Sequence, residues 1–592
     1  MAYRAASTAG RALHKKPKEA ERMFARRSNR HWLVLVLALT LLVVAACGGA
    51  PSNQGSGGQD QQAGTGSSGQ AGDGTSQPAG RRVLRMTHSW PNQIDPARGS
   101  DMASAVSLIN LYSSLVYPTP EGNVEPYAAE SWTVSDDNLT YTFQLRQGIK
   151  FHDGREMTAE DVKFSFDRLM AIGEGFAYLF RGVVREVTVD DTYTVSFHLE
   201  QPFGPFLNIL TRLYIVNSEL VKENIKPDGP YGEMGDYGTE FLNVNDAGSG
   251  AYMVRSFDIS SELVMERFPD FFGEVAPNAP DEVRIIGTTE AATVRTWMSN
   301  RELEISDTWQ TAEALASLDN IPGIDIASYL DGGQLYLMMH TQKPPLDDIH
   351  VRRAIAYLID YDALVQQIFP GTEKARGPVS RSLVGWNPSL PELEFSLDKA
   401  REELAQSRYA GQWDQYPIEY AWTAEVPALE KVALMLQANA QQVGLTIDIV
   451  QTPWLQLIER AGSKESTPHL ASIFVTPSYG EAGSQLRARF HSSTAGTWEQ
   501  LEWLENAELD AMIEDALATV DFVERMAKYA EVQARVVELF PTVALYDNVN
   551  RHAYQACYVE WPQLQAPIPV LGYMQDARFI EVFPERVASC GN

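Results

Sequence analysis

Side chains that could contact a small molecule lie just after three predicted strands in the second half of the chain. Residues 418–475 alternate strand, helix, strand, helix and strand, an order that implies parallel strands joined by right-handed crossovers. Ligands of such sheets bind outside the carboxyl ends of the strands. We therefore expect a binding cleft beside the loops at residues 423–426, 451–454 and 476–480. Candidate contacts in or beside these loops are Trp422, Glu425, Thr476 and Tyr479. The aromatic rings could stack on sugars or cover peptide side chains, and core packing is their alternative role.

The sequence lacks the residue spacings that catalysis or metal binding would need. It contains no His-Glu-x-x-His, no Cys-x-x-Cys and no Walker loop. Ser249 is not in a nucleophile elbow, because alanines at 247 and 251 flank Gly-Ser-Gly and favour a β-turn. His152 lies in the turn Phe-His-Asp-Gly. The sequence thus predicts no catalytic residue, no metal and no cofactor, with a secreted hydrolase as the rival class.

The elements that position the candidate contacts include a long scaffold motif at Tyr127–Arg168. An acidic turn precedes an alternating strand at 139–145, and Phe-His-Asp-Gly then turns the chain again. Thr158 stands three residues before Asp161, a capping-box spacing that predicts a helix over 159–170. A second motif, Val351 to Asp360, reads VRRAIAYLID.

Together these motifs resemble family 5 of the extracellular solute-binding proteins, the receptors of oligopeptide-type ABC importers. The resemblance covers roughly residues 82–590. It implies an α/β, periplasmic-binding-protein-like fold of two lobes around a cleft, of type II and in the large form with an extra subdomain. Strands passing between the lobes would act as a hinge. Ligand contacts on both lobes would stabilise the closed form.

The resemblance also predicts how the chain divides. Lobe I would comprise residues 82–116, 245–330 and 541–592, and the extra subdomain would comprise residues 117–244. Lobe II would comprise residues 331–540.

Four further candidate contacts follow from the resemblance. The loop that contains Trp90 lies beside the cleft in this family, and a strand ending near Asp307 reaches it, with Trp309 close behind. Peptide-binding members carry an Asp that binds the ligand's ammonium, in the loop after the strand that corresponds to the last one predicted in residues 418–475. Residues 474–480 here lack it, and the first acid is Glu481. Because a buried ammonium without a carboxylate is costly, Glu481, Glu425 or Asp307 would replace it, or the ligand lacks a free amino terminus.

The implied function is capture of peptides and their delivery to a permease, with ATP hydrolysis in separate subunits. An oligosaccharide or another solute, including a metal chelate, is the alternative ligand. A sensor or chaperone on the same fold is the alternative class. We expect a monomer.

Charge and the first 81 residues predict where the protein works. The 592 residues carry a net charge of −29, which argues against nucleic acid as a partner. Residues 1–46 form a predicted signal peptide, starting from Met1 or Met23, with an apolar core too short for a membrane span. Small residues before Cys47 resemble a lipobox. A lipid on Cys47 would anchor the protein on the outer face of the cytoplasmic membrane, in the periplasm or at the cell surface. Residues 47–81 are predicted to be a flexible Gly/Ser/Gln-rich tether.

Two cysteines remain, Cys557 and Cys590. Outside the cytoplasm they could pair, closing a loop worth about 3–4 kcal/mol by chain entropy. Two free thiols are the alternative.

Overall fold

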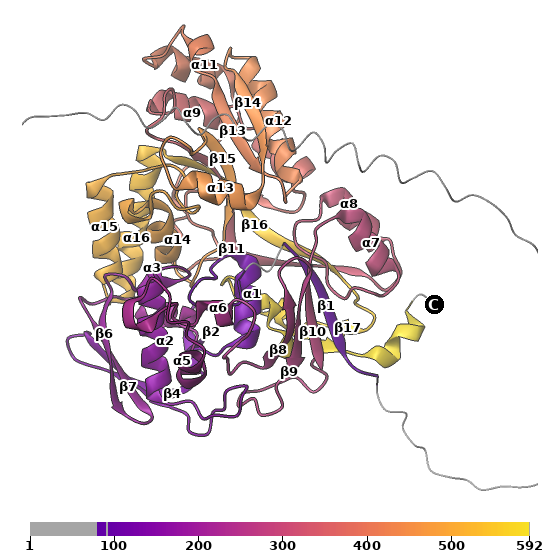
Figure 1. The fold of residues 1–592 in the computed structure, drawn as a ribbon. Helices are drawn as coiled ribbons and strands as arrows, with labels where there is room; N and C mark the ends of the chain where they lie inside the picture. Colours follow the sequence, from indigo (N-terminus) through magenta and orange to yellow (C-terminus); the bar gives the residue numbers. More distant parts are fainter. Residues whose placement is uncertain (1–79, 90–92, 591–592) are drawn as a thin grey trace, which may run out of the picture. The chain divides into compact units, whose positions relative to one another are not determined.

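The computed structural model describes residues 80–89 and 93–590, which contain three sheets of at least four strands (Figure 1). In the first sheet β1 (Val83–His88) pairs in parallel with β10 (Glu282–Gly287). Strands β9 (Glu262–Arg267) and β8 (Tyr252–Asp258) continue it in antiparallel fashion. This sheet belongs to the first lobe.

The second sheet has the order β12-β16-β11-β15-β13-β14. Its strands are β11 (Asp325–Met339), β12 (Glu373–Lys374), β13 (Ile418–Thr423), β14 (Ile447–Thr452), β15 (Leu470–Val475) and β16 (Thr542–Tyr554). Strands β14 and β15 both pair in parallel with β13, which confirms the predicted parallel arrangement. The crossovers are the helices α12 (Ala428–Gln441) and α13 (Trp454–Ala461).

The third sheet is built from the long scaffold motif and the hairpin that follows it. Its order is β4 (Ala129–Val134), β5 (Thr140–Leu145), β7 (Thr194–Leu199) and β6 (Val184–Asp191), all antiparallel. Helix α2 (Ala159–Ile172) begins with the predicted capping box, in which Thr158 and Asp161 bond reciprocally. The motif therefore has a structural role, because its residues form part of the third sheet and the helix α2.

Two long strands connect the first lobe to the second sheet. β11 and β16 pair over most of their length, from Asp325 opposite Tyr554 to Met338 opposite Thr542. At the far end of β16, Tyr554 bridges to Ile305, which bridges to β1. The ladder is interrupted between Leu330 and Gln334, where the register shifts. These strands are the expected hinge connection, and they bulge at their middle.

Hydrophobic packing groups the later helices differently from the sequence-based division. Apolar residues of α14 (Ala482–Phe490), α15 (Ala507–Ala518) and α16 (Phe522–Leu539) belong to the same buried cluster as β1, β5 and β10. A separate cluster contains β13, α12 and α9 (Ile349–Tyr357). We propose that the second lobe ends near residue 478 rather than 540. An amphipathic pattern shows that a helix has a core face, but not which core it joins.

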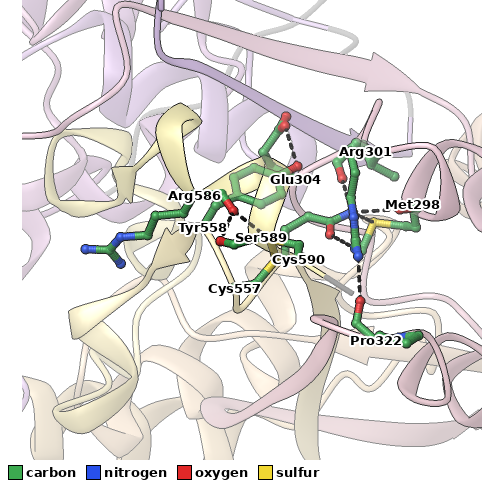
Figure 2. Close-up of a disulfide and its surroundings, with 11 residues drawn as sticks. Met298, Arg301, Glu304, Pro322, Cys557, Tyr558, Arg586, Ser589 and Cys590 are labelled. Carbon is green, nitrogen blue, oxygen red and sulfur yellow. Dashed lines mark hydrogen bonds between the residues drawn. A yellow bond between two sulfur atoms is a disulfide. The ribbon is translucent and has the colours of Figure 1, made fainter. Parts of the chain in front are cut away.

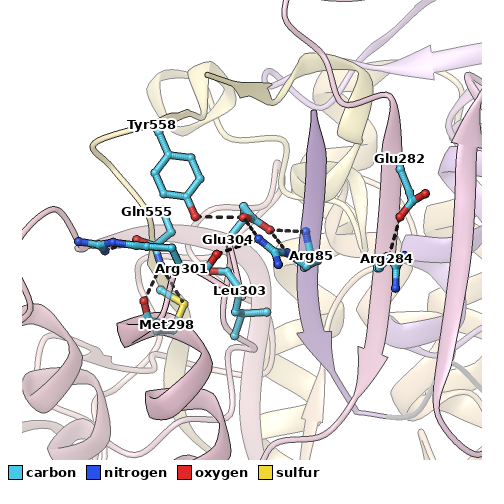
Figure 3. Close-up of polar contacts among 9 residues, drawn as sticks. All are labelled: Arg85, Glu282, Arg284, Met298, Arg301, Leu303, Glu304, Gln555 and Tyr558. Carbon is cyan, nitrogen blue, oxygen red and sulfur yellow. Dashed lines mark hydrogen bonds and ion pairs between the residues drawn. The ribbon is translucent and has the colours of Figure 1, made fainter. Parts of the chain in front are cut away.

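A disulfide closes a loop within the C-terminal segment, and a buried carboxylate ties that segment to the first lobe. Cys557 and Cys590 are bonded, with their Cα atoms 5.7 Å apart (Figure 2), so the pairing is confirmed. Beside the disulfide, the Glu304 carboxylate accepts from Arg85 Nε at 2.8 Å and from the Tyr558 hydroxyl at 3.0 Å (Figure 3). Glu304 thereby links β1 to the chain's last segment.

The remaining helices and strands are short. The helices are α1 (Met102–Leu111), α3 (Ala177–Phe180), α4 (Phe206–Ile209), α5 (Ser218–Glu223), α6 (Thr239–Leu242), α7 (Ala291–Ser299), α8 (Ala312–Asp319), α10 (Tyr361–Ala363) and α11 (Leu397–Gln406). The strands are β2 (Val116–Pro118), β3 (Val124–Pro126), β17 (Val559–Glu560) and β18 (Glu581–Val582). Within the described residues, no helix combines the length and apolarity that a membrane crossing requires.

Candidate functional site

A cavity lies where the sequence predicted one, at the carboxyl ends of the parallel strands. It encloses about 1130 Å³, part of it open to solvent. The residues after β13 and β15 line it, together with the first residue of α13 and the N-terminal end of α1. The wall thus combines the strand ends of the second sheet with a helix of the first lobe. A concave site with apolar rings and a few polar groups in its wall suits a small-molecule ligand.

Three of the predicted contacts line this cavity. They are Trp309, Glu425 and Thr476. The Trp309 ring packs against Phe474 with centroids 5.3 Å apart. Both oxygens of Glu425 accept from the backbone N–H of Trp454, at 3.1 and 3.0 Å, so this acid caps α13 while it faces the cavity. Trp90 and Cys47 lie outside the described residues.

Four other predicted contacts are interior residues that do not line the cavity. Trp422 is 5% exposed within the core of the second lobe, and Tyr479 is 2% exposed within the core of the first. Trp422 is the next-to-last residue of β13, and because side chains alternate between the faces of a strand, it packs in the core while Thr423 lines the cavity. The aromatic residues that do reach the cavity lie elsewhere.

The two buried acids among them already have partners. Glu481 forms an ion pair with Arg525, at 2.9 Å from Nη2, and accepts from the Tyr529 hydroxyl at 3.2 Å. Asp307 accepts from Thr87 Oγ1 at 3.1 Å, from Gln310 at 2.8 Å and from the backbone of Trp309. Burial raises the pKa of Asp307 to about 6. Both acids hold the fold together, and neither faces the cavity.

Asp331 is a cavity residue that the sequence reasoning missed, and it links β11 to β16 and to the loop after β15. Its Oδ2 accepts from Thr476 Oγ1 at 3.2 Å and from the side-chain amides of Asn548 and Asn550, both at 2.9 Å. These partners come from β16 and from the loop after β15. Asp331 itself begins the register shift of β11, and Gly332 follows it at φ +80°. Burial raises the pKa of Asp331, and the hydrogen bonds from its neutral donors oppose this rise in part.

The glycine pair after Asp331 is required by close packing. A Cβ on Gly332 would lie 2.7 Å from Pro477 Cγ, and its positive φ also disfavours other residues. Asp-Gly-Gly inside an otherwise apolar strand pattern is a signal for a bulge. That signal could have located this residue.

A second missed group is contributed by α13 and by the loop between α14 and α15. Trp454 and Trp498 meet edge to face with centroids 5.4 Å apart, and Glu499 adjoins them in the cavity wall. Trp454 stands in a loop that was predicted to face the cleft. Trp498 and Glu499 lie in an irregular loop, and no sequence pattern indicates their position.

A smaller cavity of about 530 Å³ adjoins the first and contains a basic residue. The two share Trp309, Val426, Phe474 and Asn548 in their walls. Arg551 lines the smaller cavity, and its guanidinium has no hydrogen bond or ion pair to any described residue. Burial lowers the pKa of Arg551. An anionic group of a ligand could bind there.

Among the described residues, no group of three or more His, Cys, Asp or Glu is placed to hold a metal ion. The arrangement is instead a cavity with acids, aromatic rings and amides in its wall. That combination can bind a ligand, and it offers no nucleophile and base in contact.

Comparison with known proteins agrees with this geometry. The model of the family described as bacterial extracellular solute-binding proteins, family 5 Middle, matches residues 123–497. The probable D,D-dipeptide-binding periplasmic protein DdpA of Escherichia coli is 28% identical over 77% of this chain and 87% of its own length. Heme-binding protein A of Haemophilus influenzae is 23% identical over 74% of this chain and 82% of its own length.

Solved structures share the fold. The periplasmic binding protein DppA from Helicobacter pylori, in complex with the peptide STSA, superposes with a TM-score of 0.75. It is 22% identical in sequence, and the match covers 85% of this chain and 99% of that one.

Proposed function

Because this chain belongs to family 5 of the bacterial extracellular solute-binding proteins, we propose that it is the peptide receptor of an ABC importer. The observation that carries the ligand class is the pair of adjoining cavities. One offers carboxylates and the other offers Arg551. A peptide with free ends has the complementary charges, an ammonium and a carboxylate. The named ligands of DdpA and of the Helicobacter pylori protein, a dipeptide and STSA, are of this class.

The receptor would close on the peptide and deliver it to membrane permease subunits, with ATP hydrolysed by further subunits. Binding to both sides of the cavity favours a closed form by differential affinity. Anchoring through a lipid on Cys47 and a monomeric state belong to this proposal.

The tryptophans of the cavity favour a second candidate ligand, an oligosaccharide. Trp309, Trp454 and Trp498 all line the wall and could stack on sugar rings. A neutral sugar, however, would leave the wall's carboxylates and Arg551 without charged partners. Desolvated charges without partners are costly, so the peptide is favoured.

Thermal unfolding in the presence of candidate ligands tests the proposal. A ligand that binds only the folded state stabilises it by about 2.7 kcal/mol at a free concentration of 100 Kd. We expect peptides to raise the melting temperature, and oligosaccharides and metal chelates to leave it unchanged. A rise with sugars or chelates but not with peptides would refute the proposed ligand class.

A further inference from the structure

The main cavity carries an excess of negative charge. Four carboxylates line it, those of Asp101, Asp331, Glu425 and Glu499. No Lys, Arg or His is among the described residues of its wall. None of the four acids takes part in an ion pair within the described part of the chain. Their hydrogen-bond donors, where they have them, are uncharged backbone and side-chain groups.

Several buried carboxylates elsewhere in the described residues are paired with arginines, and Asp307 instead accepts hydrogen bonds from neutral donors. Asp95 meets Arg168 at 2.6 Å, and Glu502 meets Arg489 at 2.7 Å, with all four side chains fully buried. Such pairing is expected, because an isolated charge away from water is strongly disfavoured. Glu499 departs from both arrangements, because its carboxylate has neither an ion pair nor a hydrogen bond to a described residue. A cation supplied by the ligand would provide the missing partner.

Glu499 is the carboxylate that most needs such a cation. It is 8% exposed, and its carboxylate has no hydrogen-bond or ion-pair partner among the described residues. Arg489 approaches it, but Arg489 Nη1 donates to the backbone oxygen of Glu499 at 2.6 Å. The charge of Arg489 is paired with Glu502. The arginine therefore fixes the loop that carries Glu499 and leaves its side chain to the cavity.

The surroundings of Glu499 suit an organic cation. Trp454 and Trp498 line the same wall, and the face of a tryptophan ring attracts an ammonium or guanidinium group. The charged and titratable groups near Glu499 are Arg489, Glu502 and Tyr178. None of them supplies an unpaired positive charge.

We propose that the cavity selects peptides of net positive charge, and that Glu499 receives an ammonium or guanidinium group of the ligand. The inference rests on the proposed function and deepens it. A neutral zwitterion would balance one acid and Arg551, whereas a further basic side chain also balances Glu499. Glu499 is a specificity-determining residue in this account.

The state of Glu499 adds a dependence on pH. Burial raises the pKa of Glu499 to about 7, and Arg489 opposes this in part. The ionised form binds a cation, so affinity for a basic peptide rises with pH through about 7. Glu499→Gln removes the titrating group and with it this rise.

Competition among matched peptides tests the proposal. Alanine-based peptides of graded length, each carrying one Lys, one Gln or one Glu, are mixed with the protein, and the complexes are quantified by native mass spectrometry. About one unit above the pKa of Glu499, we expect Lys peptides to be preferred over Gln peptides by about 10-fold, the ratio that a charge-assisted hydrogen bond supports. Glu peptides should bind most weakly.

Variants separate the role of Glu499 from a general charge effect. Glu499→Gln should bring the Lys-to-Gln ratio close to one, and Glu499→Asp should retain a preference for Lys. Glu459→Gln, an exposed acid on α13, should leave the ratio unchanged. Glu499→Gln replaces a buried charge with a neutral side chain of the same shape, so it should fold, which circular dichroism verifies.

The competition experiment distinguishes failure of the charge selection from failure of the proposed peptide-receptor function. Equal binding of Lys, Gln and Glu peptides, or an unchanged ratio in Glu499→Gln, would overturn the charge selection while leaving a peptide receptor. Binding of no peptide at all would overturn both.

Discussion

Arg489 holds the backbone of Glu499 while its charge is paired with Glu502. Its Nη1 lies 2.6 Å from the Glu499 carbonyl oxygen, and its Nη2 lies 2.7 Å from Glu502 Oε1. The guanidinium also stacks on the ring of Tyr336, 4.1 Å from the centroid. One buried arginine thus helps to fix a loop without regular structure. This is how an irregular segment can present a carboxylate to the cavity with a defined position.

Two tryptophans should respond differently to replacement by alanine. Trp454 lines the cavity, and Trp454→Ala should weaken peptide binding by about 1–3 kcal/mol, as loss of a stacking surface does. Trp422 is buried in the core, and Trp422→Ala should instead lower the free energy of unfolding by about 3–5 kcal/mol. Calorimetric titration and urea unfolding of both variants separate the two effects. A folded Trp422→Ala protein with lost affinity and intact stability would contradict the assignment.

The ion pair of Glu481 and Arg525 should be a stability element. Glu481→Gln would leave the buried guanidinium without its counter-charge, at a cost of about 3–5 kcal/mol in the free energy of unfolding. The affinity of the folded protein for peptide should be unchanged, because Glu481 does not line the cavity. Urea unfolding measures the first effect and calorimetric titration the second. A large loss of affinity without a loss of stability would return Glu481 to the ligand site.

Asp331 should stabilise the folded protein through its hydrogen bonds from β11 to β16 and to the loop after β15. Asp331→Asn replaces an acceptor oxygen with an amide donor that faces other donors. We expect a loss of at least about 2 kcal/mol in the free energy of unfolding. Asp325→Asn, at the exposed start of the same strand, is the matched control and should change stability little. Equal urea midpoints for the two variants would show that the network contributes nothing.

The raised pKa of Glu499 should be visible in ligand-free protein. Because its pKa is higher in the folded state, the native protein holds an extra proton between about pH 4.5 and about 7. The extra proton on Glu499 stabilises the folded protein fully below about pH 4.5, and this stabilisation is lost as pH rises through about 7. Over that pH range the free energy of unfolding of the wild type should fall by about 3 kcal/mol relative to that of Glu499→Gln. Urea unfolding across pH tests this, and parallel curves would contradict it.

The sequence predicted the scaffold well because local patterns determine it. The capping box of Thr158 and the parallel strands from 418 to 475 both form as expected. Loop positions at strand ends followed from the topology, which is why Glu425 and Thr476 reach the cavity.

The sequence predicted individual contacts less well, because tertiary packing decides them. Trp422 lies near the end of one strand and Tyr479 follows another, and only the packing of both lobes shows that they are core residues. Glu481 resembles a free acid until Arg525, from a helix 44 residues away, is placed beside it. Glu499 lies in a loop whose sequence shows no helix or strand periodicity, and Arg489 helps to set its position through a hydrogen bond to its backbone oxygen.

A crystal structure of the protein with the peptide that most raises its melting temperature tests the central claim directly. We predict that the peptide occupies the cavity at the carboxyl ends of β13 and β15. A nitrogen of its ammonium or guanidinium group should lie within about 2.7–3.2 Å of a Glu499 carboxylate oxygen. A peptide bound outside that cavity would contradict the account, as would one whose cation faces solvent while Glu499 stays without a partner.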